Sequence, residues 1–97
     1  MIAAPATGAV RVRIRGHVQG VWYRGWTVET ARALGLRGWV RNRSDGSVEA
    51  LFVGPAGARR EMVDRCRAGP PAARVDRVDE EVGEDDGGDG FRQLPTT

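Results

Sequence analysis

Residues 10–15 alternate without exception between aliphatic and arginine side chains. One parity holds Val10, Val12 and Ile14, and the other holds Arg11, Arg13 and Arg15. Because successive side chains of a β-strand point to opposite faces, this period of two predicts a strand with one buried and one solvated face. The chain must therefore bury one face of a sheet. We expect the arginines on the other face to be solvated rather than to form a functional basic stripe.

The rest of the chain changes its period several times, and each change marks a new element. Apolar residues in the segment 22–36 follow helical spacing, and Gly35 suits the left-handed conformation that ends many helices. Asp45 and Gly46 form a hairpin signal between two short strands. The expected elements are strands at about 10–15, 38–42, 47–53, 74–82 and 91–94, and helices at 22–36 and 55–68.

This order of elements predicts the fold class. Strand, helix, strand, strand, helix, strand makes two split units, which together form an α+β ferredoxin-like sandwich (βαββαβ). Its two helices pack on one face of an antiparallel sheet. A chain of 97 residues suffices for one domain but not for two. We therefore expect a single domain at 9–97, preceded by a flexible N-terminal tail at 1–8.

Composition narrows the possible partners and the compartment. The net charge is +2 and every basic residue is an arginine, but the segment 79–90 is acidic, which argues against a nucleic-acid surface. No apolar run reaches membrane-spanning length, and the first residues do not resemble a secretory signal. Cys66 is the one cysteine, so it can form no internal disulfide, and we expect it to be a core residue. These features favour a cytoplasmic protein without a membrane or nucleic-acid partner.

The stretch GHVQGVWYR, residues 16–24, connects the first strand to the first helix. Free backbone N–H groups and a helix N-terminus favour an anion, and Gly16 and Gly20 let the backbone approach it closely. Arg24 could place a bidentate fork on the same anion, so phosphate or sulfate is a candidate ligand. The lysine of a P-loop and the glycine spacing of a dinucleotide site are missing. A tight structural turn would explain the glycines equally well.

Asn42 is the second candidate. It shares its strand parity with Val40, which places a polar amide on the inward face. Such an amide needs partners. It either shapes the hairpin together with Asp45 or holds a water or substrate oxygen, and the residues alone leave both options open.

Two long segments resemble the two signature segments of the acylphosphatase family: GHVQGVWYR and GWVRNRSDGSVEALFVG. A third segment, GPPAARV at 69–75, resembles the one that enters the fourth strand of that family. The resemblance spans about residues 10–94, with Tyr23 in place of the commoner phenylalanine. It implies metal-independent hydrolysis of a carboxyl–phosphate anhydride by direct attack of water, with no cofactor and no covalent intermediate. It also implies that Arg24 binds phosphate and that Asn42 orients the water. The implied backbone cradle consists of His17, Val18, Gln19, Gly20, Val21, Trp22 and Tyr23.

Further expectations concern the substrate and the neighbouring side chains. We expect broad acceptance of small acyl phosphates, a monomer, a bracing role for Gln19 and a turn role for Asp45. His17 is expected to be exposed, and the spacing does not decide whether Trp22 and Trp26 wall the pocket or cover the helix. The alternatives are a regulatory anion-binding module or a nucleic-acid binder on the same fold. The chain has few aromatic residues on which bases could stack, which argues against the RNA binder. A phosphate-binding relic without turnover would have no reason to retain both Arg24 and Asn42.

Overall fold

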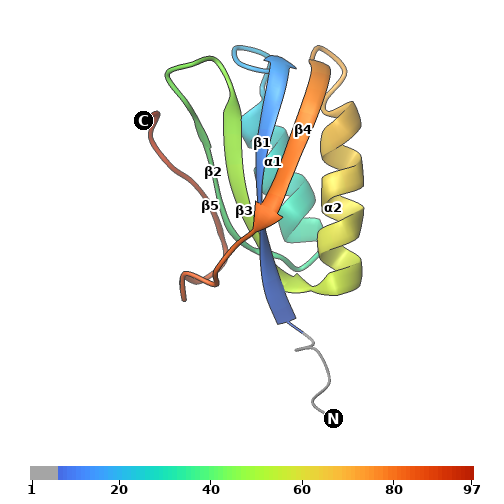
Figure 1. Cartoon of the computed structure of the whole chain (residues 1–97), viewed down its shortest axis with the longest axis vertical. Coiled ribbons are helices and arrows are strands. Elements are labelled where there is room, and N and C mark those ends of the chain that lie inside the picture. The colour runs from blue at the N-terminus through green and yellow to red at the C-terminus, as the bar shows by residue number, and fades with distance from the viewer. Residues whose placement is uncertain (1–6) are drawn as a thin grey trace.

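Two helices cover one face of a five-stranded sheet in the computed structural model, which describes residues 7–97 (Figure 1). The elements are β1 (Thr7–His17), α1 (Tyr23–Ala33), β2 (Arg37–Asn42), β3 (Val48–Pro55), α2 (Ala56–Ala68), β4 (Arg74–Val82) and β5 (Phe91–Gln93). This order confirms the predicted α+β sandwich. Neither helix in the described range is long and apolar enough to span a membrane.

The N-terminal strand is longer than the alternating pattern indicates. Strand β1 begins at Thr7, and residues 7 and 8 pair with Pro55 and Gly54 of β3. The expected tail at 1–8 therefore loses its last two residues to the sheet, and residues 1–6 lie outside the described part of the chain. The backbone hydrogen bonds of this pairing need no alternation of side chains, so the pattern could not reveal them.

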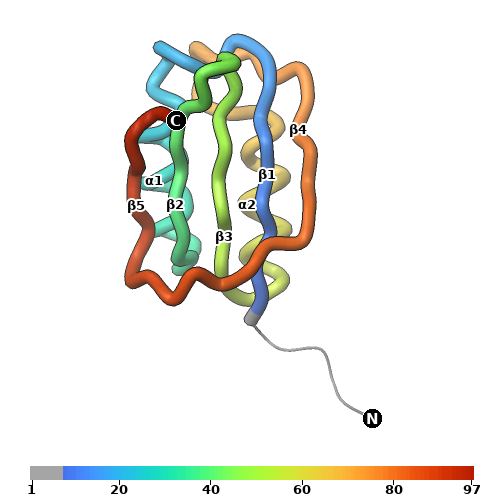
Figure 2. Tube along the Cα trace, turned by 60° about the vertical axis from the view of Figure 1, so that its left-hand side comes forward, coloured from blue at the N-terminus to red at the C-terminus, as the bar shows by residue number. Residues whose placement is uncertain are grey.

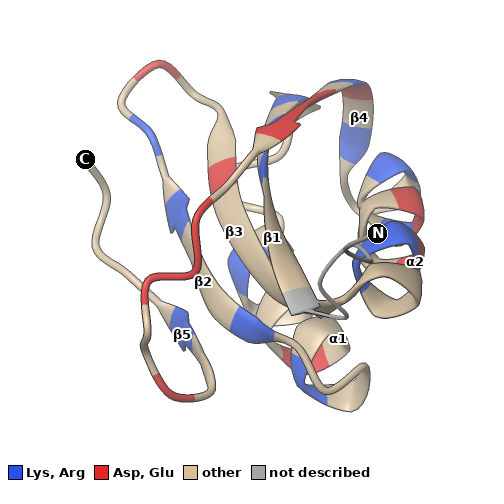
Figure 3. Cartoon of the chain, turned by 60° about the horizontal axis from the view of Figure 1, so that its bottom comes forward, with Lys and Arg blue, Asp and Glu red and all other residues tan. Residues whose placement is uncertain are grey.

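The strands follow the order β4-β1-β3-β2-β5 across the sheet (Figure 2). The first four strands of the chain pair in antiparallel fashion, as expected, whereas β5 runs parallel to β2 and makes the sheet mixed. The reason is the acidic connection after β4, which crosses one end of the sheet to reach the opposite edge (Figure 3). Arg37 pairs with Asp85 and Arg92 with Asp86, so this connection is tied to the strands it passes.

The core lies between the helices and the sheet face that they cover. It is built from the inward parity of β1 and β3 together with one face of each helix, and its fully buried members include Val12, Ile14, Ala50, Phe52, Tyr23, Ala31, Met62 and Cys66. Phe91 of β5 stacks on Phe52 with a centroid separation of 5.6 Å. Burial raises the pKa of the Cys66 thiol to about 12, so the thiol stays protonated. The expectation that Cys66 is a core residue is confirmed.

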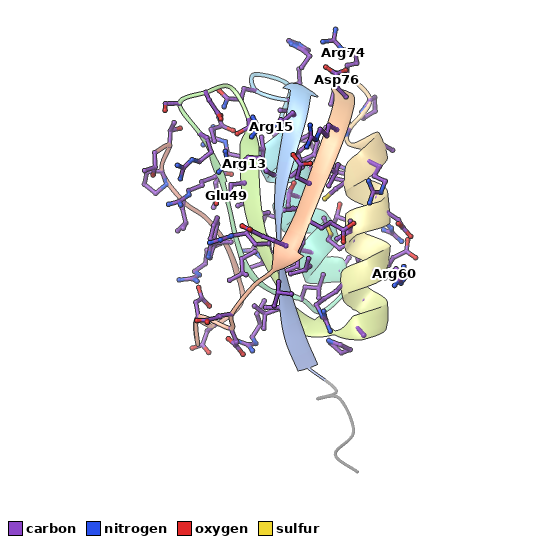
Figure 4. The ribbon with its side chains drawn as sticks, viewed as in Figure 1. Arg13, Arg15, Glu49, Arg60, Arg74 and Asp76 are labelled. Atoms are coloured by element: carbon purple, nitrogen blue, oxygen red, sulfur yellow. The ribbon has the colours of Figure 1, made fainter. Side chains whose placement is uncertain are left out.

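The other sheet face carries the arginines of β1, each matched by a carboxylate. Arg11 pairs with Glu81 and Arg15 with Asp79 across the β1–β4 ladder. Glu49 of β3 is buried between Arg13, Arg41 and Arg43, as Figure 4 shows for Arg13. The expected arginine face therefore exists, but its charge is largely neutralised within the chain, which argues against a free basic stripe.

Gly16 provides a direct test of the β1–β4 pairing. The register shifts between Arg15 and Gly16, the φ angle of Gly16 is 135°, and a Cβ atom there would lie 2.2 Å from the Arg74 carbonyl oxygen. We expect Gly16→Ala to lower the free energy of unfolding by at least about 2 kcal/mol, because it adds backbone strain and a backbone clash.

Gly57 is the matched control for this substitution. It lies in the first turn of α2, and a Cβ atom there would meet nothing within 4 Å. Gly57→Ala should leave stability unchanged or raise it by up to about 1 kcal/mol, because alanine loses less backbone entropy than glycine. Urea denaturation measures both variants. Equal stability of the two variants would contradict the predicted strain and clash at Gly16.

Candidate functional site

The loop after β1 and the end of β2 meet at one end of the sheet, where the strands stop. Both strands run antiparallel to β3, so their carboxyl ends point the same way, and Ile14 and Asn42 both pair with Val48. Two strand spacings separate Ile14 from Asn42, which is about 10 Å. Helix α1 begins at the same end of the sheet, the upper one in Figure 1. The fold thus brings the two sequence segments singled out above together.

A cleft of about 130 Å³ opens at this end of the sheet, with room for several waters or a small anion. It is lined by Val18, Gly20, Trp22, Tyr23, Arg24, Gly25, Asn42 and Gln93. Six of these belong to the set expected from the sequence. The other three expected residues, His17, Gln19 and Val21, do not line the cleft. His17 is the exposed last residue of β1, in agreement with its expected exposure.

Two lining residues were missed by sequence reasoning. Gly25 follows the motif in the first turn of α1, and no period distinguishes it from other helical positions. Gln93 reaches the cleft because β5 pairs parallel with β2. No local pattern encodes that long-range pairing.

A larger cavity of about 300 Å³ lies beside α2, but its charged groups are mostly engaged within the chain. Arg67 pairs with Glu80, and Arg59 donates to the carbonyl oxygen of Gly54. Chemistry therefore favours the smaller cleft, where polar groups lack partners.

The N-terminus of α1 presents uncapped donors to the cleft. Its N-cap residue, Trp22, has φ 66° and ψ 22°, makes no side-chain cap, and no acidic residue follows in the first turn. The first N–H groups of a helix have no partner within it and carry the positive end of the helix dipole. They are therefore available to an anion.

Arg24 lies in the same first turn and is half-buried at the cleft. None of the ion pairs formed within the described part of the chain includes it. Most other arginines of the described chain form ion pairs with carboxylates, among them Arg11, Arg13 and Arg15. The Arg24 guanidinium thus keeps its donors available for a ligand.

Asn42 carries a buried side-chain oxygen, Oδ1, that accepts no hydrogen bond within residues 8–97. Leaving a buried acceptor unpaired is costly. The hairpin does not use this amide, because Asp45 shapes the turn instead. Asp45 Oδ1 accepts from the Ser47 N–H at 2.9 Å and from the Ser47 hydroxyl at 2.6 Å, and these bonds lower the Asp45 pKa to about 2. The turn role expected for Asp45 is confirmed, and the Asn42 oxygen remains available to a donor in the cleft.

Gln19 ties the loop to the hairpin that follows Asn42. Its Nε2 donates to the carbonyl oxygens of Arg43 at 2.8 Å and Ser47 at 2.9 Å. The expected bracing role is therefore confirmed. On the opposite side, the Tyr23 hydroxyl donates to the Cys66 carbonyl oxygen at 2.7 Å and anchors the start of α1 to α2. Gly20, with φ 76° and open space around its missing side chain, lets the loop turn between these anchors.

Gln19→Ala tests the brace. It removes two hydrogen bonds, while the two carbonyl oxygens keep their backbone donors, the N–H groups of Gly46 and Arg43. At about 0.5–1.5 kcal/mol for each hydrogen bond, we expect a loss of about 1–3 kcal/mol in the free energy of unfolding. Gln93→Ala is the matched control, because Gln93 is an exposed glutamine on the same cleft. Its removal should change stability by no more than about 0.5 kcal/mol. Thermal or urea unfolding of both variants decides, and a neutral Gln19→Ala would rule out the brace.

Comparison with known proteins agrees with this geometry. The acylphosphatase family model matches residues 10–93. An acylphosphatase of Rhodospirillum rubrum is 72% identical over 65 residues, covering 67% of this chain and 71% of the relative. One from Rhizorhabdus wittichii is 57% identical over 88 residues, covering 91% and 89%. The solved structure of an acylphosphatase from Coxiella burnetii superposes with a TM-score of 0.87 at 32% identity, covering 91% of this chain and 93% of that one. The chain belongs to the acylphosphatase family.

Proposed function

We propose that this chain hydrolyses small acyl phosphates to a carboxylate and inorganic phosphate by direct attack of water, without a metal ion. Family membership supports the hydrolase activity and the acyl phosphate substrate. The observation that carries the mechanism is the convergence on one cleft of free helix donors, an unpaired arginine and an unpaired amide oxygen.

The phosphoryl group occupies the cradle formed by the loop and the first turn of α1. Backbone N–H groups there donate to its oxygens, and Arg24 supplies a planar fork that matches two oxygens at once. Phosphoryl transfer depends chiefly on positioning and on stabilising charge. Preorganised donors are well suited to this, because they need no reorganisation as the charge moves toward the leaving oxygen.

Asn42 aims the attacking water. The water donates one hydrogen bond to Oδ1 of Asn42, and this orientation turns a lone pair of the water oxygen toward phosphorus. A bond then forms between the water oxygen and phosphorus while the bond between phosphorus and the acyl oxygen breaks, and the water proton passes to the phosphate or to solvent. The departing carboxylate is a stable anion, so the reaction needs no general acid. The proposal assigns no nucleophilic side chain.

The remaining expectations are part of the same proposal. Inorganic phosphate or sulfate binds in the cradle as a product-like ligand, and the chain acts as a monomer in the cytoplasm without a cofactor. A single free, buried cysteine is consistent with a reducing compartment.

Hydrolysis of benzoyl phosphate in excess EDTA tests the proposal. Wild type should turn over the anhydride but not p-nitrophenyl phosphate, an ester with a poorer leaving group. Arg24→Ala should lose about 10³-fold or more in rate, because an arginine that stabilises the transferring phosphoryl group is worth that much. Asn42→Ala should lose roughly 10²- to 10³-fold, as for the removal of one preorganised polar partner.

Arg60→Ala is the matched control, because Arg60 is exposed on α2, away from the cleft edge (Figure 4). Its activity should equal that of wild type. If wild type shows no turnover but binds phosphate, the chain is an anion-binding module rather than an enzyme. If EDTA abolishes turnover, the metal-independent mechanism is wrong.

A further inference from the structure

Trp22 combines two unfavourable features at the mouth of the cleft. Its side chain is 59% exposed, and the only other exposed large hydrophobic residue of the described chain is Val82. It is also the only non-glycine residue within 7–97 that adopts a positive φ angle. A left-handed backbone costs a residue of this size on the order of 1–3 kcal/mol. A single exposed aromatic needs no explanation, but an exposed aromatic held in a strained conformation at a ligand site does.

The indole lies against the first turn of α1. A Cβ atom at Gly25 would lie 2.0 Å from Trp22 Nε1, so the ring occupies the space that a side chain at that position would need. Both Trp22 and Gly25 line the cleft. The ring therefore lies over the first turn of α1 at the rim of the cleft.

Trp26, the other tryptophan of this helix, has a different role. It is half-buried, packs against the core, and meets the Tyr23 ring edge-on at a centroid distance of 5.3 Å. The sequence left open whether these tryptophans wall the pocket or cover the helix. The structure separates them, because Trp26 covers the helix and Trp22 lines the cleft.

We propose that Trp22 is the platform on which the acyl group of the substrate packs, so that it favours aromatic over small acyl groups. This inference rests on the proposed function. The phosphoryl half of an acyl phosphate goes to the polar cradle, and the acyl half must project toward the cleft mouth. The other large apolar lining residues, Val18 and Tyr23, are buried in the core. Trp22 alone offers an exposed aromatic face, and aromatic rings gain from stacking as well as from burial.

The size of the preference follows from the strength of such contacts. A stacking contribution of about 0.7–1.4 kcal/mol, within the range for aromatic pairs, corresponds to roughly three- to tenfold in kcat/KM. Small acyl phosphates remain substrates, so the broad acceptance expected from the sequence becomes a graded one. The Trp22 ring contacts the acyl group while its backbone belongs to the phosphate cradle, so the ratio between two acyl phosphates isolates the contribution of the ring.

Two substitutions at Trp22 isolate this contribution. Trp22→Gly removes the ring and tolerates the positive φ angle, whereas Trp22→Phe keeps an aromatic face. The ratio of kcat/KM for benzoyl phosphate to that for acetyl phosphate should fall roughly three- to tenfold in Trp22→Gly and stay within about twofold of wild type in Trp22→Phe. Because the Trp22 backbone belongs to the phosphate cradle, inhibition by inorganic phosphate is measured in both variants to report any change in the cradle, and the substrate ratio cancels it. Trp39→Phe is the control, because Trp39 lies on the sheet under Arg41, with its ring centroid 4.9 Å from the guanidinium carbon.

A binding measurement separates failure of this inference from failure of the proposed function. Benzoylphosphonate and acetylphosphonate resist hydrolysis, and their relative affinities report the acyl preference without turnover. Wild type should bind the benzoyl compound more tightly, and Trp22→Gly should lose that preference. If the preference is absent in wild type or survives in Trp22→Gly, Trp22 is not the platform, whether or not acyl phosphates are hydrolysed. If the preference depends on Trp22 but no acyl phosphate is turned over, only the hydrolase proposal fails.

Discussion

The pairing of β3 with β1 on one side and β2 on the other is the constraint on which the site depends. Because both neighbours run antiparallel to β3, the loop after β1 and the last residue of β2 must emerge at the same end of the sheet. Val48 pairs with Ile14 and Asn42 simultaneously, which fixes their separation. The strand that sets this geometry is itself buried on both faces, by the helices on one side and by arginine side chains around Glu49 on the other.

Unsatisfied polar groups gather where the loop and the two strands meet. Elsewhere most of the arginines pair with carboxylates and Asp45 caps the hairpin. Arg13 Nε is the one other buried side-chain atom without a partner among the described residues. At the cleft, in contrast, an uncapped helix end, the Arg24 guanidinium and the Asn42 oxygen have no partner within the described chain. These costs are tolerated because Gln19 and Tyr23 anchor the surrounding backbone, and a bound phosphoryl group and water would offset them. Functional sites commonly break the local rules that the rest of a fold obeys.

Much of the fold was predictable because its signals are local. The alternation of β1, the helical spacing after Trp22 and the Asp45-Gly46 turn each depend on neighbouring residues. The missed features depend on distant contacts. Gly16 was assigned to the ligand loop, but it lies in β1, where its missing side chain accommodates the Arg74 carbonyl of β4. The parallel pairing of β5, and with it the place of Gln93, follows from a connection that crosses the whole sheet. The cleft residues Arg24 and Asn42 were predictable because the motifs that carry them are specific in type and spacing.

The central claim is that water attacks phosphorus directly while Arg24 and the helix end hold the phosphoryl group. Hydrolysis of benzoyl phosphate by the wild-type protein in ¹⁸O-labelled water, under single-turnover conditions with EDTA, tests it most directly. The account predicts one labelled oxygen in the inorganic phosphate and none in the benzoate, because the bond that breaks is the one between phosphorus and the acyl oxygen. Label in the benzoate would mean attack at the carbonyl carbon. That result would contradict the roles given to Arg24 and Asn42.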